Sequence, residues 1–364
     1  PYTTLFRSKY RYQAVRTTPD VSSNHKMLRE MVLQGCNSAV MEVTSHALDQ
    51  NRVEHIHFDV AIFTNLTVDH LDYHRDMENY CAAKSKLFSS LDRKIKKKTH
   101  HYHPVAVINK DSTWHQRIIE KCSSSIITYG IESEADLKAS EIAFSSCGTS
   151  LNLSYKGTSI PFAWPIIGRF NVYNLLAAVA VGLVRGLSLE AVAKIMKTAS
   201  PAPGRLEFVP NPLNLKIYVD FAHSDDALLN VLSCLKELKP SRLITVFGCG
   251  GDRDRHKRPL MGKVSEEYSD VVIVTSDNPR TEIPENIVKN IMAGFKTPEK
   301  HMVELDRRKA IEKAIHMATP EDIILIAGKG HEPYQVFAHK TIEFDDRKVA
   351  LQLCEQKHAH DYSI

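Results

Sequence analysis

The sequence predicts an α/β protein with mostly parallel sheets, arranged in about two domains. Three observations point to this fold class. Short runs rich in β-branched residues recur along the chain, patterns typical of amphipathic helices separate several of them, and 364 residues are more than one ordinary core accommodates. Strands that alternate with helices form a parallel sheet covered by helices on both faces.

The predicted strands, in chain order, each lead into a polar or glycine-rich stretch. They lie within residues 38–46, 59–70, 105–111, 216–224, 243–254, 270–280 and 322–332. Helical patterns occupy 226–238 and 283–295. Because ligands bind at the carboxyl ends of the strands in open α/β sheets, we expect the polar stretches to gather at one edge and to carry the chemistry.

Domain boundaries follow from breaks in these patterns. The segment SPAPGRLE (200–207) separates the two predicted domains, since its prolines and glycine cannot continue the preceding helix. Residues 134–164 are expected to form a small antiparallel insertion that turns at Lys156–Gly157.

The opening PYTTLFRS (1–8) matches a translated frame of a common sequencing adapter. We therefore expect an assembly artefact at 1–8, a natural chain that extends upstream, and domains at 9–200 and 201–364. The alternative is that these eight residues are an ordinary loop.

Composition limits the classes of partner. A net charge of +4 gives no argument for nucleic acid, and the basic run at 92–103 is interpreted as a solvated surface turn. Seven cysteines, none in a C-x-x-C pair, favour reduced thiols in a cytosol-like compartment. The apolar run at 175–187 is interrupted by Gly and Arg and is interpreted as a buried helix, not a membrane span.

Carboxylates and imidazoles just past the first two predicted strands form a candidate site. The group comprises Glu42, His46, Asp69, His70 and Asp72. On adjacent strand ends, a carboxylate and an imidazole could bind a divalent ion with room for phosphate and water. Each residue taken singly could instead cap the following helix. Taken together, they favour a site.

Lys84 interrupts the apolar stripe of a helix predicted at 76–91. The other members of the stripe are Met77, Tyr80, Cys81, Leu87 and Phe88. A lysine in such a position more often extends its amine to solvent. If the amine is buried, it loses basicity and can add carbon dioxide near a metal, which would turn a cation into a metal-bridging carbamate.

Asn171 and Asn174 lie three residues apart near a predicted helix start. One of them could be the N-cap. The pair could also offer amide donors and acceptors to the edge of a purine.

The later strands end in charged loops that contain glycine. The first loop, at 248–259, contains Arg253, Lys257 and Arg258, and the second, at 276–280, contains Arg280. The third, at 327–332, contains Lys329, His331 and Glu332. Singly these charges could be surface ion pairs. Together they indicate a zwitterionic ligand, with arginine for a carboxylate and glutamate for an ammonium. No G-x-x-x-x-G-K-[ST] phosphate loop occurs in the sequence.

These motifs, in this order, resemble the Mur ligases, and within that family the ligases that add a third amino acid to a UDP-N-acetylmuramoyl dipeptide. The resemblance runs from about Thr17 to the C-terminus, through TTPD, EVTSHALDQNR, TNLTVDHLDYH, YCAAKSKLF, GRFNVYNLLAA, PGRLE, VDFAHS, FGCGGDRDRHKRPLMG, SDNPRTE and AGKGHE. It implies a central ATPase domain, part of which is missing, and a Rossmann-like C-terminal domain. A UDP-binding domain and the phosphate loop are expected upstream of Thr17.

The resemblance also implies roles for the matching residues. Magnesium would be bound by the expected catalytic residues Glu42, His70 and Lys84, the last as a carbamate. The nucleotide-sugar substrate would contact Thr17, Thr18, Thr44, Gln50 and Arg52. ATP would contact Asn171, Asn174, Arg205 and Asp220. Diaminopimelate would contact Arg253, Asp277, Asn278, Pro279, Arg280, Gly328 and Glu332.

The implied activity is an ATP-dependent amide ligation in peptidoglycan synthesis. ATP would phosphorylate the D-glutamyl carboxylate of UDP-N-acetylmuramoyl-L-alanyl-D-glutamate, and an amine of meso-diaminopimelate would attack the acyl phosphate. The motif D-N-P-R is typical of family members that add diaminopimelate, whereas lysine-adding members lack this arginine. We expect a bacterial, cytoplasmic, monomeric enzyme, and no turnover by these residues alone.

Two departures from the family pattern and three alternatives remain. Thr44 stands where the family usually has Ser, and FAHSDDAL replaces Tyr-Ala-His-(Thr/Asn)-Pro, which puts the local loop shape in doubt. A folylpolyglutamate synthetase is one alternative, disfavoured by SDNPRTE and TTPD. A non-enzymatic plastid relative is disfavoured by the retained Glu42, His70 and Lys84. A nicotinamide dehydrogenase would need a G-x-G-x-x-G motif, which is absent from the sequence.

Overall fold

The computed structural model describes residues 2–3, 12–13, 16–91, 103–145, 148–199 and 202–361. Most of the segment expected to be an artefact, and the basic run except His103, lie outside these residues. The chain divides into two compact units, which we call the N-terminal and C-terminal units. The N-terminal unit comprises residues 1–140, 152–161 and 172–196, and the C-terminal unit comprises residues 141–151, 162–171 and 197–364.

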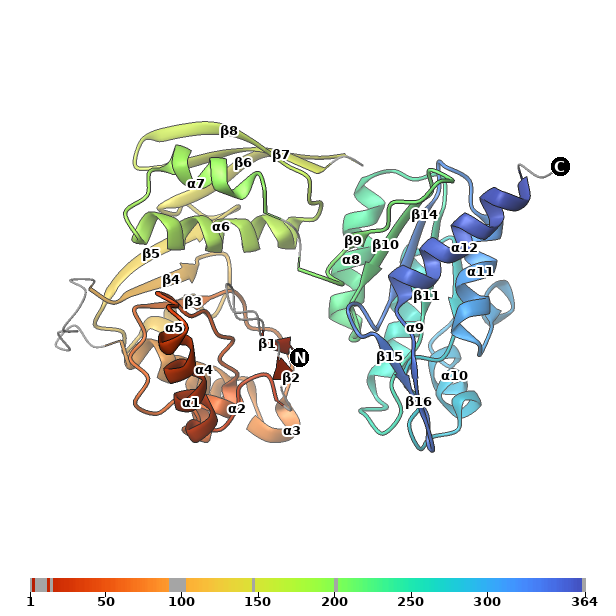
Figure 1. Cartoon of the computed structure of the whole chain (residues 1–364), viewed down its shortest axis with the longest axis horizontal. Helices are drawn as coiled ribbons and strands as arrows, with labels where there is room; N and C mark the ends of the chain where they lie inside the picture. The colour runs from red at the N-terminus through yellow and green to blue at the C-terminus, as the bar shows by residue number, and fades with distance from the viewer. Residues whose placement is uncertain are drawn as a thin grey trace. The chain divides into compact units, whose positions relative to one another are not determined.

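The first sheet has six strands in the order β3-β4-β5-β6-β7-β8 (Figure 1). They are Val60–Phe63, Val105–Asn109, Ser125–Gly130, Leu137–Ser145, Gly148–Tyr155 and Thr158–Trp164. Strands β3 to β6 pair in parallel. A separate pair of short strands, β1 (Tyr2–Thr3) and β2 (Tyr12–Gln13), is antiparallel.

The predicted insertion at 134–164 is confirmed in part. Strands β7 and β8 are joined by Lys156 and Gly157, whose φ angles of +47° and +82° are those of a two-residue type I′ hairpin turn. Strand β6, however, pairs in parallel with β5 and so extends the main sheet. Strand β6 therefore pairs with β5 on one edge and with β7 on the other.

The helices of this half of the chain lie between and after the strands. They are α1 (Val21–Leu33), α2 (Ser45–Asp49), α3 (Leu71–His74), α4 (Met77–Ser89), α5 (His115–Ile119), α6 (Arg169–Val184) and α7 (Leu189–Met196). The apolar stripe predicted on α4 is confirmed, because Tyr80, Cys81, Leu87 and Phe88 pack into one core with residues of β3 and β4.

The strand predicted within 38–46 does not form. Residues 36–44 are irregular up to the start of α2, and Val40 is 84% exposed. Strand β3 is the edge strand of this sheet in the described chain, and residues 36–44 do not pair with its open edge. A β-branched composition favours a strand only where a partner strand is available.

The second sheet also has six strands, in the order β13-β12-β11-β14-β10-β9. In chain order they are β9 (Glu207–Phe208), β10 (Lys216–Asp220), β11 (Leu243–Phe247), β12 (Val271–Val274), β13 (Met302–Val303) and β14 (Ile323–Ala327). All pairs are parallel except β9 with β10. A hairpin of β15 (Tyr334–Val336) and β16 (Thr341–Glu343) follows.

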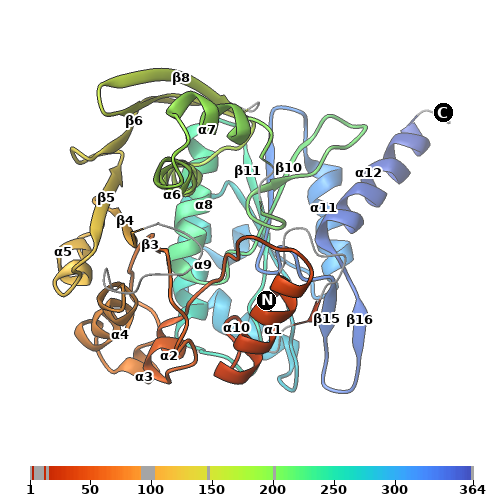
Figure 2. The ribbon, with the colours of Figure 1, turned by 60° about the vertical axis from the view of Figure 1, so that its left-hand side comes forward.

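Helices cover both faces of this sheet, as the alternation of strands and helices predicts. They are α8 (Asp225–Glu237), α9 (Lys257–Tyr268), α10 (Pro284–Met292), α11 (Arg307–Met317) and α12 (Asp346–Asp361), with a 3₁₀ turn, η1, at Pro298–Lys300. Figure 2 shows α8 and α9 on one side of β10 and β11, with α11 and α12 on the other.

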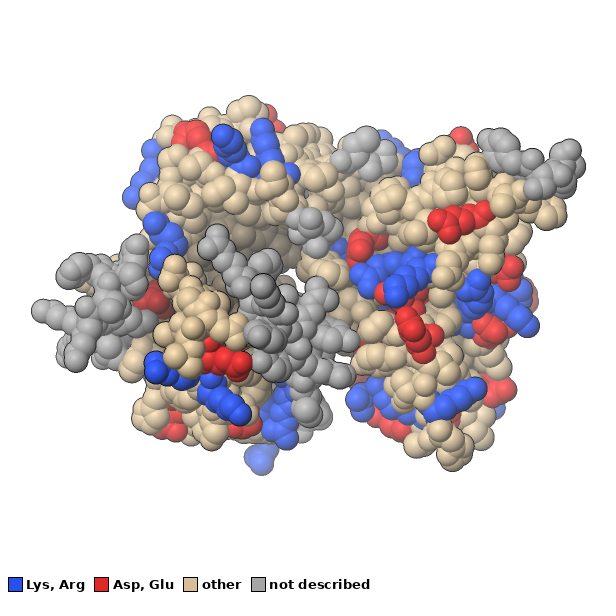
Figure 3. All heavy atoms as spheres, viewed as in Figure 1, with Lys and Arg blue, Asp and Glu red and all other residues tan. Residues whose placement is uncertain are grey.

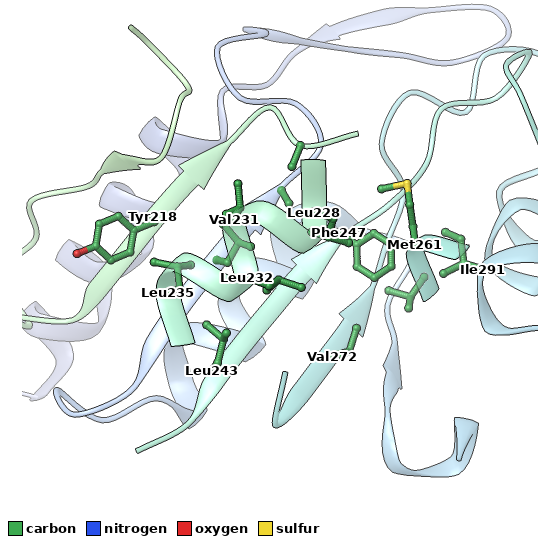
Figure 4. Packing of buried hydrophobic residues seen from close by; sticks show 14 of the residues in the cluster. Tyr218, Leu228, Val231, Leu232, Leu235, Leu243, Phe247, Met261, Val272 and Ile291 are labelled. Atoms are coloured by element: carbon green, nitrogen blue, oxygen red, sulfur yellow. The ribbon is translucent and has the colours of Figure 1, made fainter. Parts of the chain in front are cut away.

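The two cores of this unit use alternate residues of the same strands. Figure 4 shows Leu228 and Leu232 of α8 among side chains of β10 and β11, within the core that also contains residues of α9 and α10. The opposite core joins Ile217, Ile244 and Ile324 to α11 and α12. Each strand is therefore buried on both faces, which explains its continuous apolar run.

Two predictions from composition can be compared with the structure. None of the described helices is long and apolar enough to cross a membrane. The cysteines of the described chain are Cys36, Cys81, Cys122, Cys234, Cys249 and Cys354, and all are free thiols. On the face drawn in Figure 3, described Lys and Arg side chains are interspersed with Asp and Glu, in keeping with the net charge of +4.

Candidate active site

A hydrogen-bonded group at the start of α2 contains residues expected to contact the nucleotide-sugar substrate. The Thr18 hydroxyl donates to the Glu42 carbonyl oxygen at 2.8 Å and accepts from the Thr44 N–H at 3.1 Å. Thr44 caps α2, where its hydroxyl accepts from the Ala47 N–H at 3.2 Å. Thr18 is buried, so one hydroxyl holds the segment of Thr17 and Thr18 against the helix start.

Arg52 and Gln50 belong to the same network. Arg52 Nη1 donates to the Thr18 carbonyl oxygen at 3.2 Å, and Arg52 Nε donates to Gln50 Oε1 at 3.0 Å. Gln50 Nε2 donates to the Tyr73 hydroxyl at 3.2 Å. The structure therefore joins Thr18, Thr44, Gln50 and Arg52, although they come from different elements.

Lys84 lies half-buried on α4, close to acidic side chains. Burial lowers the pKa of the Lys84 ammonium, while the negative charges of Glu42 and Asp69 act in the opposite direction. The Lys84 Nζ lies 5.2 Å from the centre of the Tyr80 ring. A lowered pKa increases the neutral fraction of the amine, which is the form that adds carbon dioxide.

His70 approaches the same ring. Its imidazole centre lies 5.9 Å from that of Tyr80, and its backbone is left-handed with a φ of +55°. Asp69 Oδ1 accepts from the His70 N–H at 2.7 Å, which fixes this turn. His70 and Lys84 thus flank Tyr80, and Glu42 is close enough to Lys84 for their charges to interact.

The donor set at Glu42, His70 and Lys84 fits magnesium only if Lys84 is modified. Across the described residues, no three His, Cys, Asp or Glu side chains converge into a metal site. Glu42 and His70 offer one carboxylate and one imidazole, and a carbamate on Lys84 would add a second oxygen ligand. Magnesium prefers such oxygen donors and keeps several waters.

Asn171 and Asn174 differ in burial at the start of α6. Asn171 is 6% exposed, and its Nδ2 donates to the Ile167 carbonyl oxygen at 2.8 Å, which supports the first turn of the helix. Asn174 is exposed. Contact of this pair with adenine stays a prediction.

Arg205 packs against Phe221, the residue that follows Asp220. The Arg205 guanidinium lies 5.0 Å from the centre of the Phe221 ring. Burial raises the pKa of Asp220 to about 6, although its carboxylate accepts from the N–H groups of Leu206 at 2.6 Å and Ala222 at 2.7 Å. Asp220 is therefore held rigidly at the carboxyl end of β10.

The loops after β11, β12 and β14 meet at the carboxyl edge of the second sheet, as the sequence predicts. Strand β11 pairs with both β12 and β14. The Asn278 carbonyl oxygen accepts from the Gly251 N–H at 2.9 Å, which ties two of the loops together. Gly328 has a φ of +111°, and a Cβ there would lie 2.7 Å from Asp277 Oδ2, so this contact requires glycine.

Arg280 is oriented by the loop after β11. Its backbone has a φ of +51°, its N–H donates to the Val336 carbonyl oxygen at 3.1 Å, and Nη1 donates to the Gly251 carbonyl oxygen at 2.7 Å. Arg253 is exposed, and its Nη1 donates to the Asp252 carbonyl oxygen at 3.0 Å. Two guanidinium groups therefore belong to the loops at one edge, with the buried Pro279 beside them.

Glu332 supplies the carboxylate at this edge. Asn278 Nδ2 donates to Glu332 Oε2 at 2.9 Å, so the loops after β12 and β14 are linked by side chains. The structure thus brings together Asp277, Asn278, Arg280, Gly328 and Glu332, which were predicted to share a pocket.

Arg258, one of the charged residues of this edge, has a different role from the one expected. Arg258, interpreted as a cation for the ligand, is fully buried and donates to both Glu282 oxygens, at 3.1 and 2.8 Å. Its hydrogen bonds lower the pKa of Glu282 to about 2. A sequence signal existed: Arg258, Met261, Gly262 and Ser265 follow the spacing of one buried helix face.

Comparisons with known proteins cover both units. Residues 2–182 match the Mur ligase middle domain, and residues 204–330 match the Mur ligase, glutamate ligase domain. The chain is 43% identical over 354 residues to a UDP-N-acetylmuramoyl-L-alanyl-D-glutamate–2,6-diaminopimelate ligase of Geobacter sulfurreducens, covering 93% of this chain and 69% of that protein. It is 46% identical to a ligase of the same name from Chlamydia pneumoniae, covering 93% and 68%.

Two solved structures resemble this chain to different degrees. A UDP-N-acetylmuramoyl-L-alanyl-D-glutamate–2,6-diaminopimelate ligase structure has a TM-score of 0.65 and 35% identity, covering 94% of this chain and 69% of that one. A folylpolyglutamate synthase of Mycobacterium tuberculosis has a TM-score of 0.58 at 20% identity, covering 75% and 62%. The second likeness is one of fold alone.

Proposed function

Because the chain belongs to the Mur ligase family, we propose that it is an ATP-dependent ligase that joins meso-diaminopimelate to UDP-N-acetylmuramoyl-L-alanyl-D-glutamate in peptidoglycan synthesis. Relatives at 43% and 46% identity carry the name of this activity. We place the enzyme in the bacterial cytoplasm as a monomer.

The observation that carries the proposal is the charge arrangement at the carboxyl edge of the second sheet. Arg280 is aimed by the Gly251 carbonyl, while Glu332 is linked to Asn278 across the neighbouring loop. A guanidinium suits a carboxylate and a carboxylate suits an ammonium. Diaminopimelate carries both groups at each of its ends, so its distal end matches this pair, whereas the distal end of lysine lacks the carboxylate.

The reaction requires positioning and charge neutralisation more than a protein nucleophile. The D-glutamyl carboxylate oxygen bonds to the γ-phosphorus of ATP, and ADP leaves. The neutral amine of diaminopimelate then attacks the acyl carbon, the phosphate leaves with the electron pair of the broken C–O bond, and the nitrogen loses one proton to solvent. Arg280 and Glu332 hold the distal end of the amino acid, which presents its other amine for the attack.

The N-terminal unit would hold the phosphates and the nucleotide-sugar substrate. Magnesium held by Glu42, His70 and carbamylated Lys84 would neutralise phosphate charge during the transfer. Thr17, Thr18, Thr44, Gln50 and Arg52 would contact the substrate through the network at the start of α2. ATP would also contact Asn171, Asn174, Arg205 and Asp220, of which only Asn174 belongs to the N-terminal unit.

Two measurements test the proposal. Protein expressed from the complete gene is incubated with the UDP-dipeptide, ATP, Mg²⁺ and meso-diaminopimelate, and the UDP-tripeptide is measured by mass spectrometry. Calorimetry with the 364-residue chain compares meso-diaminopimelate with L-lysine. We expect tripeptide formation and binding of lysine weaker by about 100-fold or more, because lysine leaves Arg280 unpaired. Lack of product, or equal binding of both amino acids, would contradict the proposal.

A further inference from the structure

Lys329 is a buried cation next to the proposed amino-acid pocket. Its side chain has no exposed surface, although it lies in a loop between Gly328 and Gly330. Both glycines have positive φ angles, and a Cβ on Gly330 would lie 2.7 Å from Phe221 Cβ. The loop therefore packs too closely for other residues at these positions, and this packing places Lys329 inside the protein.

Three partners surround the Lys329 ammonium. Nζ lies 3.1 Å from Asn278 Oδ1, 3.1 Å from Glu332 Oε2, and 5.6 Å from the centre of the Tyr334 ring. A buried ammonium requires such compensation, because an unpaired charge in the interior is costly. At zero exposure the group is also too deep to contact a ligand in the pocket itself.

Glu332 differs from Lys329 in that it reaches the surface of the pocket. Its side chain is 22% exposed. Oε2 accepts from both Lys329 Nζ and Asn278 Nδ2, at 3.1 and 2.9 Å. Within the described part of the chain, no hydrogen bond is formed by Glu332 Oε1. Two donors on one oxygen fix the rotation of the carboxylate and leave the other oxygen for a ligand.

Asn278 forms hydrogen bonds with both Lys329 and Glu332. It is 3% exposed, and its Oδ1 accepts from Lys329 Nζ and from the Val336 N–H at 3.0 Å. Both lone pairs of this oxygen are therefore used inside the protein. The Asn278 side-chain oxygen is thus committed to Lys329 and Val336, and one of the two N–H donors on its Nδ2 is used by Glu332.

We propose that Lys329 is a positioning residue for amino-acid selection: its buried ammonium fixes Glu332 so that one carboxylate oxygen receives the distal ammonium of the incoming amino acid. This inference rests on the function proposed above. It assigns the two distal groups of the ligand to different residues. Arg280 binds the distal carboxylate, and Glu332, positioned by Lys329, binds the distal ammonium.

The test uses two ligands that each lack one distal group. Binding to the 364-residue chain is measured by calorimetry for meso-diaminopimelate, for L-2-aminopimelate, which lacks the distal amine, and for L-lysine, which lacks the distal carboxylate. The variants are Lys329→Met, which keeps the length without the charge, and Lys329→Gln, which keeps a donor without the charge. Lys340→Met, an exposed lysine in the β15–β16 turn, is the matched control.

We expect Lys329→Met to bind meso-diaminopimelate roughly 30-fold more weakly or worse, the range for removal of one partner of a buried charged pair. Its preference for meso-diaminopimelate over L-2-aminopimelate should disappear, while its preference over L-lysine persists. A general structural defect would reduce both preferences together. The proposal is therefore overturned if the variant still prefers meso-diaminopimelate to L-2-aminopimelate, or if it loses this preference and the preference over L-lysine equally.

Two further outcomes are distinguishable. If Lys329→Met does not fold, Lys329→Gln is tested instead, by the ratio of its affinities for meso-diaminopimelate and L-2-aminopimelate. Thermal unfolding shows whether each variant is folded. If the unmodified chain does not bind meso-diaminopimelate, the proposed function itself fails. A Lys329→Met variant that binds all three ligands like the unmodified chain overturns only the role of Lys329.

Discussion

At the scale of single residues, the amino-acid pocket depends on a few side chains whose direction is set by backbone groups. Arg280 has left-handed backbone geometry, and one of its guanidinium nitrogens is bound by the Gly251 carbonyl. Non-glycine residues adopt this geometry rarely, and usually where the surrounding structure compensates its cost. Here the bond from the Arg280 N–H to Val336 provides that support.

Arg280→Ala should weaken binding of meso-diaminopimelate to the chain by about 100-fold, because the distal carboxylate loses a charged, preorganised partner. Binding of L-lysine should change little, since it has no distal carboxylate. Calorimetry with both ligands checks this, and Arg255→Ala provides the control, because the side chain of Arg255 is 70% exposed. A similar loss for both ligands would refute the assignment of Arg280 to the carboxylate.

At the scale of elements, helix starts connect the substrate-binding segments to the fold. Thr44 caps α2, and its backbone N–H donates a hydrogen bond to the Thr18 hydroxyl oxygen. Its side chain therefore contributes to helix stability, and its backbone positions the segment of Thr17 and Thr18. The capping role needs the side-chain hydroxyl, whereas the role in positioning Thr18 needs only the backbone N–H.

Thr44→Ala should lower the free energy of unfolding by about 1 kcal/mol, the usual cost of losing an N-cap side chain. Thr44→Ser should stay within a few tenths of a kcal/mol of the unmodified chain, since it keeps the capping oxygen, as estimated from cap rankings. Urea unfolding followed by circular dichroism measures both. Identical midpoints for the alanine and serine variants would show that the cap contributes nothing.

At the scale of the whole molecule, two glutamates of the C-terminal unit make stability depend on pH. Burial raises the pKa of Glu266, but hydrogen bonds from Lys296 and Thr297 outweigh it and lower the pKa to about 2. The hydrogen bonds of Arg258 lower the pKa of Glu282 to about 2. Both values lie below the ordinary value of 4.5, so the folded state binds fewer protons than the unfolded state in acid.

The contribution of these carboxylates is present above the unfolded pKa and is lost as the pH falls toward their folded pKa. We expect the melting temperature of the chain to fall steeply between about pH 5 and pH 2, as linkage requires. Glu282→Gln should melt lower at neutral pH and show a shallower slope. Glu321→Gln, at an exposed site, is the control. An unchanged slope in Glu282→Gln would rule out this source of acid sensitivity.

Much of the fold could be predicted from local pattern. The runs ending at Asp220, Phe247, Val274 and Ala327 form adjacent parallel strands, and the chain turns at Lys156–Gly157 as predicted. The strand predicted within 38–46 was wrong, because strand formation depends on pairing with a neighbour, which composition does not reveal. The parallel pairing of β6 was missed for the same reason.

The sequence by itself determined the alternation of strands and helices and the polar stretches that follow the strands, because both depend on residues close together in the chain. It therefore also located the edge where Asp277, Arg280, Gly328 and Glu332 meet. Only the tertiary structure decided which charges at that edge are buried. Lys329 lies inside because Asn278, 51 residues earlier, accepts its hydrogen bond, and Arg258 lies inside because Glu282 pairs with it. The burial of a charge depends on partners brought together by folding, and these are distant in sequence.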